Sequence, residues 1–216
     1  MKLTDNQLQD LACQLRCPNG NDGIKAGEMM NHTNSNIINK TIISLDIKVH
    51  DSLLEIGPGN GAHVKNIEAN NTITYIGIDI SVTMIAEAAR INSGLANATF
   101  QLTDADSISF VENQFDKIFT VNTIYFWNDP QGYTNQIAHV LKPGGLVAIG
   151  FIPKSTIRHI PFAKFGFTLY DIDTVISLLQ NAGLVIVSKN IETEMVTSNS
   201  GVQIEREFVI ITATKQ

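Results

Sequence analysis

From Leu53 onward, short apolar runs of strand length alternate with longer amphipathic stretches in which apolar residues recur at helical spacing. This alternation is typical of βαβ units, in which parallel strands form a sheet and the connecting helices cover its faces. We therefore predict an α/β fold with a doubly wound, mostly parallel sheet. Its first five strands are expected at residues 53–56, 73–78, 98–103, 116–122 and 146–151.

Helices are expected between these strands, at residues 61–69, 81–91 and 129–141. Ser81 and Asp129 suit helix N-caps, and Pro130 suits the first position of a helix. The Lys-Pro-Gly-Gly sequence at 142–145 is expected to end the last of these helices.

The C-terminal part departs from a purely parallel sheet. A helix expected at residues 171–182 precedes two β-rich runs, 184–189 and 208–214, which a hairpin-like link near 197–201 joins. These runs complete a seven-stranded sheet and make its C-terminal strand antiparallel.

The N-terminal segment has a different character. Residues 4–16 predict a short amphipathic helix capped by Thr4 or Asp5, and isoleucines at helical spacing predict a second helix near residues 37–45. Between them, the polar, glycine-rich stretch 19–27 is interpreted as a connection. We therefore expect a helical cap or lid at residues 1–46 and an α/β domain at 47–216.

Composition narrows the classes of function. The 216 residues carry a net charge of −6, and their basic residues are scattered, whereas binding to nucleic-acid phosphates requires clustered Lys and Arg. No apolar run reaches the roughly 18–20 residues of a membrane span, and the N-terminus lacks the apolar core of a signal peptide. We expect a cytoplasmic protein without a nucleic-acid partner or a membrane span. Cys13 and Cys17 have no nearby His pair, so no metal site is expected.

The apolar strand at 53–56 runs into a glycine-rich turn, Gly57-Pro58-Gly59-Asn60-Gly61. Glycines permit positive φ angles and close approach of a ligand to the backbone, and a following helix offers free N–H groups to a carboxylate. The spacing is G-x-G-x-G with Glu55 two residues ahead. It differs from the G-x-G-x-x-G of dinucleotide-binding turns.

This turn resembles motif I of the class I S-adenosylmethionine-dependent methyltransferases, and the resemblance covers roughly residues 50–150. It is similar to the broad group that includes the quinone-biosynthesis C-methyltransferases. The resemblance implies a Rossmann-like fold that binds S-adenosyl-L-methionine and releases S-adenosyl-L-homocysteine, with no metal. In the turn it implies cofactor contacts from Glu55, Gly57, Pro58, Gly59 and Gly61.

Further along the chain, the resemblance assigns Asp79, which precedes Ile80 at the end of the second strand, to the two ribose hydroxyls, because a carboxylate is a bidentate acceptor for a diol. Met84 matches a position that packs on the adenine, although an ordinary core role on the helix is an equal alternative. Asp104 and Ala105 match the place where the adenine edge is recognised, and Asp106 is the competing carboxylate. Ile80 and Asn122 are also assigned to the cofactor site.

Ligands of open α/β sheets bind at the carboxyl ends of the strands, which places Tyr125 and Trp127 near the transferred methyl group. A packed aromatic cluster is the alternative. The long loop at 153–170 is expected to form a second wall of the acceptor site, with Arg158 and Phe162 binding the acceptor and His159 as a weak candidate for general base.

Methyl transfer from a sulfonium needs alignment of the acceptor and removal of water, so a dedicated catalytic base is optional. We therefore predict an S-adenosylmethionine-dependent methyltransferase that acts on a small-molecule acceptor. Two alternatives remain at this stage: a methyltransferase of protein or RNA, and a noncatalytic nucleotide-binding module on the same fold.

Overall fold

A seven-stranded sheet forms the centre of the molecule in the computed structural model, which describes residues 3–68, 72–197 and 203–216. The strand order is β3-β2-β1-β4-β5-β7-β6; β1 to β5 are parallel, and β7 runs antiparallel to both of its neighbours. This arrangement confirms the predicted fold class. The strands are β1 (Ser52–Ile56), β2 (Thr74–Asp79), β3 (Ala98–Leu102), β4 (Phe115–Val121), β5 (Leu141–Phe151), β6 (Leu184–Thr197) and β7 (Gln203–Lys215).

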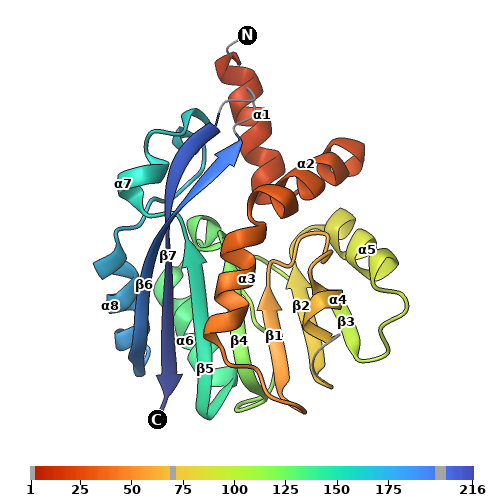
Figure 1. The fold of residues 1–216 in the computed structure, drawn as a ribbon, viewed down its shortest axis with the longest axis vertical. Helices are drawn as coiled ribbons and strands as arrows, with labels where there is room; N and C mark the ends of the chain where they lie inside the picture. The colour runs from red at the N-terminus through yellow and green to blue at the C-terminus, as the bar shows by residue number, and fades with distance from the viewer. Residues whose placement is uncertain (1–2, 69–71, 198–202) are drawn as a thin grey trace.

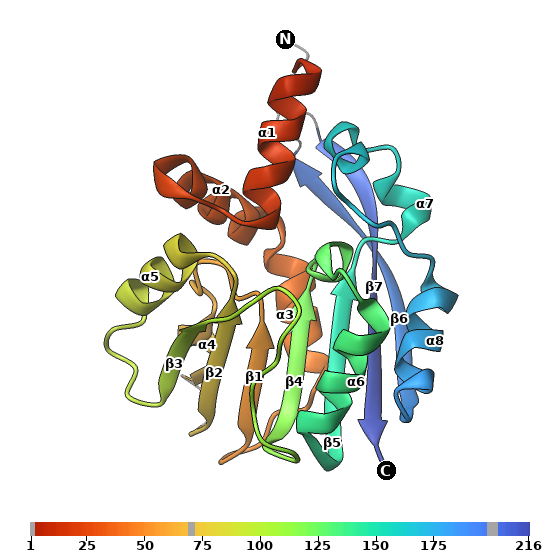
Figure 2. The same ribbon diagram turned by 180° about the vertical axis from the view of Figure 1, so that it is seen from behind.

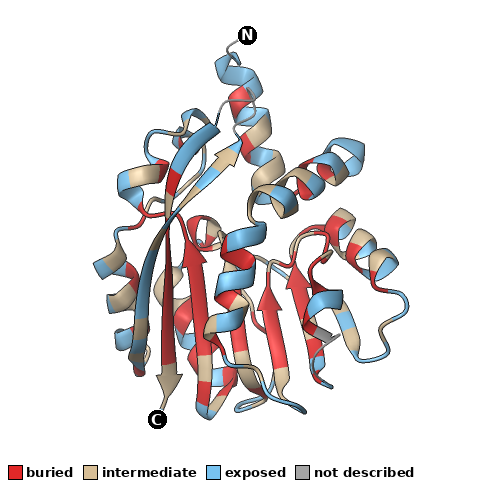
Figure 3. Ribbon diagram, in the orientation of Figure 1, coloured by how far each residue is buried: buried red, intermediate tan, exposed pale blue. Residues whose placement is uncertain are grey.

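Helices cover both faces of the sheet (Figures 1 and 2). The helix α3 (Ser35–Ser44) lies in front of the sheet in Figure 1, whereas α6 (Pro130–Val140) and α8 (Ile172–Asn181) lie in front when the molecule is seen from behind. Because both faces are covered, the central strands are buried on both sides (Figure 3). Leu53 and Leu54, adjacent in β1 and therefore on opposite faces, are both fully buried.

The predicted caps are confirmed. Ser81 precedes α5 (Val82–Ile91) and its hydroxyl accepts a hydrogen bond from the Met84 N–H; Asp129 precedes α6 and accepts one from Gly132. Several boundaries differ from expectation. Strand β6 extends past residue 189 to Thr197, and β7 begins before residue 208, at Gln203. The helix α4 (Val64–Glu68) begins later because residues 61–63 continue the glycine turn. Strand β5 begins earlier, at Leu141, because the Lys-Pro-Gly-Gly sequence lies at an irregularity within the strand and does not separate strand from helix.

The N-terminal segment contains one more helix than expected. Helix α1 (Asp5–Arg16) begins at a capping box formed by Thr4 and Gln7. The stretch interpreted as a connection is instead the first part of α2 (Gly20–Thr33). The reason is packing. A Cβ on Gly23 would lie 2.6 Å from the Pro18 carbonyl carbon, and one on Gly27 would lie 2.7 Å from Met84 Sδ, so these glycines let α2 pack closely despite their low helix propensity.

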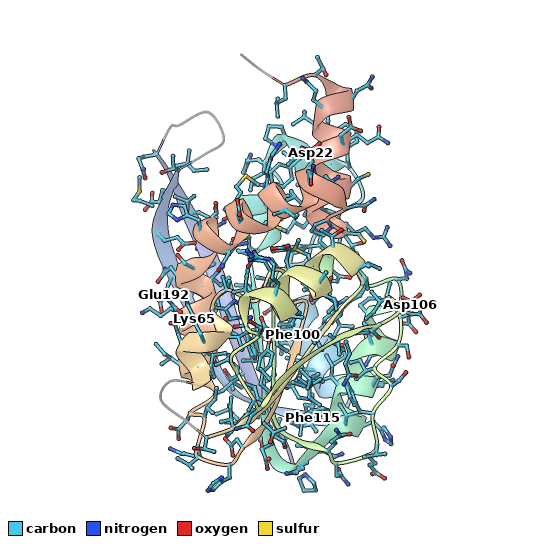
Figure 4. All side chains as sticks on the ribbon, turned by 90° about the vertical axis from the view of Figure 1, so that its right-hand side faces the viewer. Asp22, Lys65, Phe100, Asp106, Phe115 and Glu192 are labelled. Carbon is cyan, nitrogen blue, oxygen red and sulfur yellow. The ribbon has the colours of Figure 1, made fainter. Side chains whose placement is uncertain are left out.

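Helices α1 and α2 lie above the carboxyl ends of the strands, whereas α3 packs against the sheet itself (Figure 1). The side view places α1 and α2 at one end of the molecule and Phe115, at the start of β4, toward the other (Figure 4). None of the helices in the described part of the chain is long and apolar enough to cross a membrane.

The C-terminal strands β6 and β7 form a long antiparallel pair whose upper ends rise beside α1 (Figure 1). The predicted link near 197–201 lies mostly outside the described residues. The segment 153–170 is less irregular than the predicted long loop, because it contains α7 (Lys154–Ile157) and a 3₁₀ helix, η2 (Pro161–Lys164).

Candidate functional site

A pocket of about 140 Å³ lies at the carboxyl ends of β1, β2 and β4, beneath α1 and α2. We call it the turn pocket because the glycine-rich turn forms one of its walls. Parallel strands present their carboxyl ends at one edge of the sheet, which is where ligands of such sheets bind. Of the predicted cofactor residues, those that line it are Glu55, Gly57, Pro58, Gly59, Asp79, Ile80, Met84, Ala105 and Asn122.

The glycines of the turn have the positive φ angles that the sequence predicts. Gly57 has φ +74°, and a Cβ there would lie 2.4 Å from Thr123 Cγ2, so a larger residue would displace the segment after β4. Gly59 has φ +56°, and a Cβ there would meet no atom within 4 Å. The turn therefore leaves open space beside its backbone on the pocket side.

Gly61 does not line either pocket, unlike the other turn glycines. Its hydrogen atom faces Ala88, with 3.1 Å between an added Cβ and the Ala88 Cβ. Its carbonyl accepts a hydrogen bond of 2.9 Å from Asn92 Nδ2. The structure thus gives Gly61 a role in packing the turn against α5.

Asp79 occupies the end of β2 and is 9% exposed. Its Oδ2 accepts a hydrogen bond of 3.2 Å from the Gly59 N–H, and its Oδ1 accepts one of 2.9 Å from the Ser81 N–H. Burial raises the pKa of this carboxyl to about 6, partly offset by these N–H donors. Because each carboxylate oxygen has a second lone pair, both oxygens retain acceptor capacity toward the pocket.

Glu55 lines the turn pocket, yet its carboxylate is already engaged below it. His63 Nε2 lies 2.8 Å from Oε2 and 3.0 Å from Oε1, and the Tyr75 hydroxyl donates to Oε2 at 2.5 Å. All three side chains are buried. Burial lowers the pKa of His63, but the charge of Glu55 and its hydrogen bond raise it by more, so the net pKa is raised. The group is therefore a buried ion pair supporting the floor of the pocket.

The turn pocket also has an apolar lining, which includes Met84, Ala105 and Trp127. Trp127 stacks on Tyr133 with 4.7 Å between ring centroids. Asp104 is exposed and is not among the lining residues, because the turn after β3 directs its neighbours Thr103 and Ala105 inward.

The competing carboxylate, Asp106, also lies at the surface. Its Oδ2 accepts a hydrogen bond of 2.9 Å from Asn128 Nδ2. Figure 4 shows Asp106 at the right-hand edge of the molecule. The structure therefore brings neither of these two carboxylates into the turn pocket.

A second pocket of about 140 Å³ adjoins the first, and we call it the aromatic pocket. Asn122 and Phe126 line both pockets, so the two adjoin at the end of β4, a place that we call the junction. Asn122 has φ +58°, a conformation that Asn tolerates better than most residues, and its N–H donates to the Gly150 carbonyl. This backbone geometry places Asn122 in the lining of both pockets.

The predicted acceptor residues separate into two groups. Tyr125 and Phe162 line the aromatic pocket, and Trp127 lines the turn pocket. Arg158 and His159 are exposed, line neither pocket and contact each other at 3.2 Å between Arg158 Nε and His159 Nε2. They follow α7, whose buried Ile157 faces the pocket while the next two side chains point away. In this structure His159 therefore lies outside both pockets, and its role as general base stays a prediction.

Several lining residues were not among the predicted site residues. Asn31 and Asn34 come from α2 and its C-cap, and Arg206 comes from β7. The sequence holds a signal only for Arg206: an arginine inside an apolar strand faces Glu194 across a hairpin, and these residues are direct partners in the β6–β7 register. Asn31 and Asn34 fall within the segment predicted as a cap or lid, but the sequence does not single them out as lining residues.

No group of three or more His, Cys, Asp or Glu side chains within residues 3–68, 72–197 and 203–216 is placed to hold a metal ion. Cys13 and Cys17 are both free thiols and exposed. The expectation of a metal-free site stays a prediction.

The amino-acid sequence matches those of known methyltransferases. A family described as a methyltransferase domain matches residues 54–149. The chain is 32% identical over 130 residues to the uncharacterized methyltransferase YdaC of Bacillus subtilis, a match that covers 60% of this chain and 71% of that protein. It is 30% identical over 147 residues to phosphoethanolamine N-methyltransferase of Triticum aestivum, covering 64% of this chain and only 29% of that longer protein.

The fold has counterparts among solved structures. A chain from the Haloferax volcanii complex between the Trm112 methyltransferase activator and a methyltransferase superposes with a TM-score of 0.76 and 15% identity, covering 99% of both chains. At that identity the likeness concerns the fold alone.

Proposed function

Because the chain belongs to the class I S-adenosylmethionine-dependent methyltransferase family, we propose that it binds S-adenosylmethionine in the turn pocket and methylates a small molecule held in the aromatic pocket. The observation that carries this proposal is the juxtaposition of the glycine turn with the buried Asp79 carboxylate, joined by the Gly59 N–H hydrogen bond. A diol-binding carboxylate beside an open backbone cradle suits a nucleoside with an amino-acid tail.

Different residues of the turn pocket bind different parts of the cofactor. Asp79 accepts hydrogen bonds from the two ribose hydroxyls, and the apolar lining formed by Met84, Ala105 and Trp127 holds the adenine. The open backbone side of Gly59 receives the methionine portion. Glu55 supports the pocket from below through its bonds to His63 and Tyr75.

When bound, S-adenosylmethionine supplies a methyl group on a sulfonium: the acceptor's lone pair forms the new bond to the methyl carbon, the carbon–sulfur electron pair goes to sulfur, and S-adenosylhomocysteine leaves. The chain's contribution is alignment and exclusion of water. Asn122 and Phe126 lie at the junction of the two pockets, and Leu15 of α1 and Met30 of α2 also line both. Alignment of this kind contributes up to roughly 7–11 kcal/mol in well-oriented reactions. A proton released by the acceptor passes to solvent, since no base at the junction is needed for this step.

The proposal is tested by calorimetric titration with S-adenosylhomocysteine. We expect one site, and we expect Asp79→Ala to weaken binding by about 100-fold, because two hydrogen bonds to a charged acceptor are lost. Asp173→Ala, which removes an exposed carboxylate on α8, is the matched control and should bind normally. Equal affinities for the two variants would contradict the ribose assignment, and absence of binding to the native protein would overturn the proposal.

A further inference from the structure

The walls of the aromatic pocket are almost entirely apolar. They come from α1, α2, the segment after β4 and the segment 153–170. Phe167 forms the centre of the wall, with its ring centroid 4.7 Å from that of Phe126 and 5.7 Å from that of Phe162. Met29, Ile157 and Ile160 complete it. No carboxylate, Lys or His lies among its lining residues in the described part of the chain.

The charged side chain that lines this pocket, Arg206, is already neutralised. Its Nη2 and Nε donate to Glu194 Oε1 at 2.5 and 2.9 Å. Its Nη2 also donates to the Thr33 carbonyl, and its Nη1 donates to Asn34 Oδ1. An anionic ligand would have to compete with a buried carboxylate for this guanidinium, which costs desolvation without a free cation in return.

The phenol group of Tyr125 is likewise engaged. Its oxygen accepts a hydrogen bond of 2.6 Å from the Ile152 N–H, and its hydroxyl has the Ile152 carbonyl at 3.1 Å and Asn122 Oδ1 at 3.0 Å as acceptors. Burial raises its pKa well above the ordinary range, so it stays neutral. The ring is a wall of the pocket, and its hydroxyl faces the protein.

The aromatic pocket has room for a small apolar group. A cavity of about 140 Å³ with aliphatic and aromatic walls is comparable to engineered apolar cavities of about 150 Å³ that take up benzene. One six-membered ring, or an aliphatic group of similar volume, therefore fits. Its reactive atom would point to the junction lined by Asn122 and Phe126.

We propose that the methyl acceptor is an uncharged molecule whose single ring or short aliphatic chain fills the aromatic pocket; this inference rests on the proposed function. It sets the chain apart from the phosphoethanolamine N-methyltransferases to which it is similar. A phosphate group in the aromatic pocket would find no unpaired cation among its described lining residues, whereas Arg16 of α1 lines the turn pocket. Transfer of an unpaired anion into such a site is costly.

Binding of a matched pair of probes tests the inference. The probes are p-cresol and 4-hydroxybenzoate, which differ by a methyl group in place of a carboxylate, and O-phosphoethanolamine is the third ligand. Affinities are measured by calorimetry with and without S-adenosylhomocysteine. We expect p-cresol to bind at least about tenfold more tightly than either anion, because only the anions must be desolvated without a partner.

Two variants of Ile160 and one control variant test whether the preference for the uncharged probe arises in the aromatic pocket. Ile160→Asp places a carboxylate in its wall and should weaken p-cresol binding by about tenfold while leaving S-adenosylhomocysteine affinity unchanged. Ile43→Asp makes the same change at a residue that is 72% exposed on α3 and should affect neither ligand. Ile160→Trp fills the cavity without adding charge, so it tests the same site if the aspartate variant does not fold.

The outcomes separate the two proposals. Loss of S-adenosylhomocysteine binding with retained p-cresol preference overturns the proposed function alone. Normal S-adenosylhomocysteine binding with equal or tighter binding of 4-hydroxybenzoate or O-phosphoethanolamine overturns the inference about the acceptor. Unchanged p-cresol affinity in both Ile160 variants overturns the assignment to the aromatic pocket.

Discussion

Asp79 combines burial with two backbone donors, and burial dominates, so the pKa of its carboxyl is raised to about 6. A protonated carboxyl cannot accept hydrogen bonds from both hydroxyls of a ribose. If Asp79 binds the ribose, ligand binding must therefore be coupled to loss of its proton. The coupling lies in an accessible pH range because the pKa is close to neutrality.

We expect the affinity for S-adenosylhomocysteine to be constant above about pH 7 and to fall by about tenfold per pH unit below pH 6, as one proton must be released on binding. Calorimetry between pH 5 and pH 8, with circular dichroism to verify folding, measures this. An affinity that stays level down to pH 5 would show that Asp79 does not accept the hydroxyls as a carboxylate.

The ion pair between His63 and Glu55 makes a different prediction, about stability. The pKa of His63 is raised in the folded protein, so the folded protein binds this proton more tightly than the unfolded chain does. The resulting stabilisation is fully present below the ordinary histidine pKa and is lost as the pH rises through the folded value. We expect His63→Gln to lower the free energy of unfolding more at pH 6 than at pH 9.

Urea unfolding at the two pH values measures this difference. His139→Gln serves as the control, because His139 is an exposed residue at the end of α6. Equal losses at the two pH values would indicate that the pair is neutral in the folded protein.

At the scale of secondary structure, most helices follow from caps and periodicity, as Ser81, Asp129 and Thr4 illustrate. Helix α2 does not. Its glycines lower the local helix propensity by about 1 kcal/mol each relative to Ala, so a sequence-based prediction favours a loop. Contacts with Pro18 and with α5, which lie outside the helix, decide its structure.

Gly23→Ala tests the importance of this packing. In an isolated helix this change is stabilising, but here the new Cβ would lie 2.6 Å from the backbone of Pro18. We expect a loss of about 1–3 kcal/mol in the free energy of unfolding, as for other overpacking substitutions. Gly94→Ala, where a Cβ would meet no atom within 4 Å, is the matched control in thermal denaturation. Stabilisation by Gly23→Ala would show that α2 can move away from Pro18 without penalty.

At the scale of the whole molecule, Arg206 connects the β6–β7 hairpin to the end of α2, which is distant in sequence. It joins β7 to Glu194 of β6 and to Thr33 and Asn34 at the end of α2. Asn31 adds a second connection, because its Nδ2 donates to Asn60 Oδ1 in the glycine turn at 3.2 Å. The helices above the pockets are thereby tied to the sheet on two sides.

Removing Arg206 alone leaves the charge of Glu194 without its cationic partner, since the two side chains are only 9% and 8% exposed and the carboxylate then keeps a hydrogen bond of 2.8 Å from Asn36 Nδ2. We expect Arg206→Met to cost about 3–5 kcal/mol in stability, and the double change with Glu194→Leu to recover much of that loss. Breaking the exposed pair of Lys25 and Asp22 with Lys25→Met should change stability little. Chemical denaturation compares the four proteins, and a double variant no more stable than Arg206→Met would refute the account.

The strands, the helix N-caps and the glycine turn were predictable from the sequence because each depends on residues that are close in the chain. Periodicity, N-cap chemistry and positive φ at Gly57 and Gly59 are local properties. The placement of Asp79 at the same end of the sheet as that turn follows too, since parallel strands share an edge.

The remaining features were decided by tertiary structure. That Ala105 faces the pocket while Asp104 faces solvent depends on how one turn leaves β3, and that Arg158 and His159 point outward depends on which side of α7 packs inward. The neutral character of the aromatic pocket depends on Glu194 meeting Arg206. Such features arise where residues from separate elements meet, and a linear pattern contains no information about the orientation of one element against another.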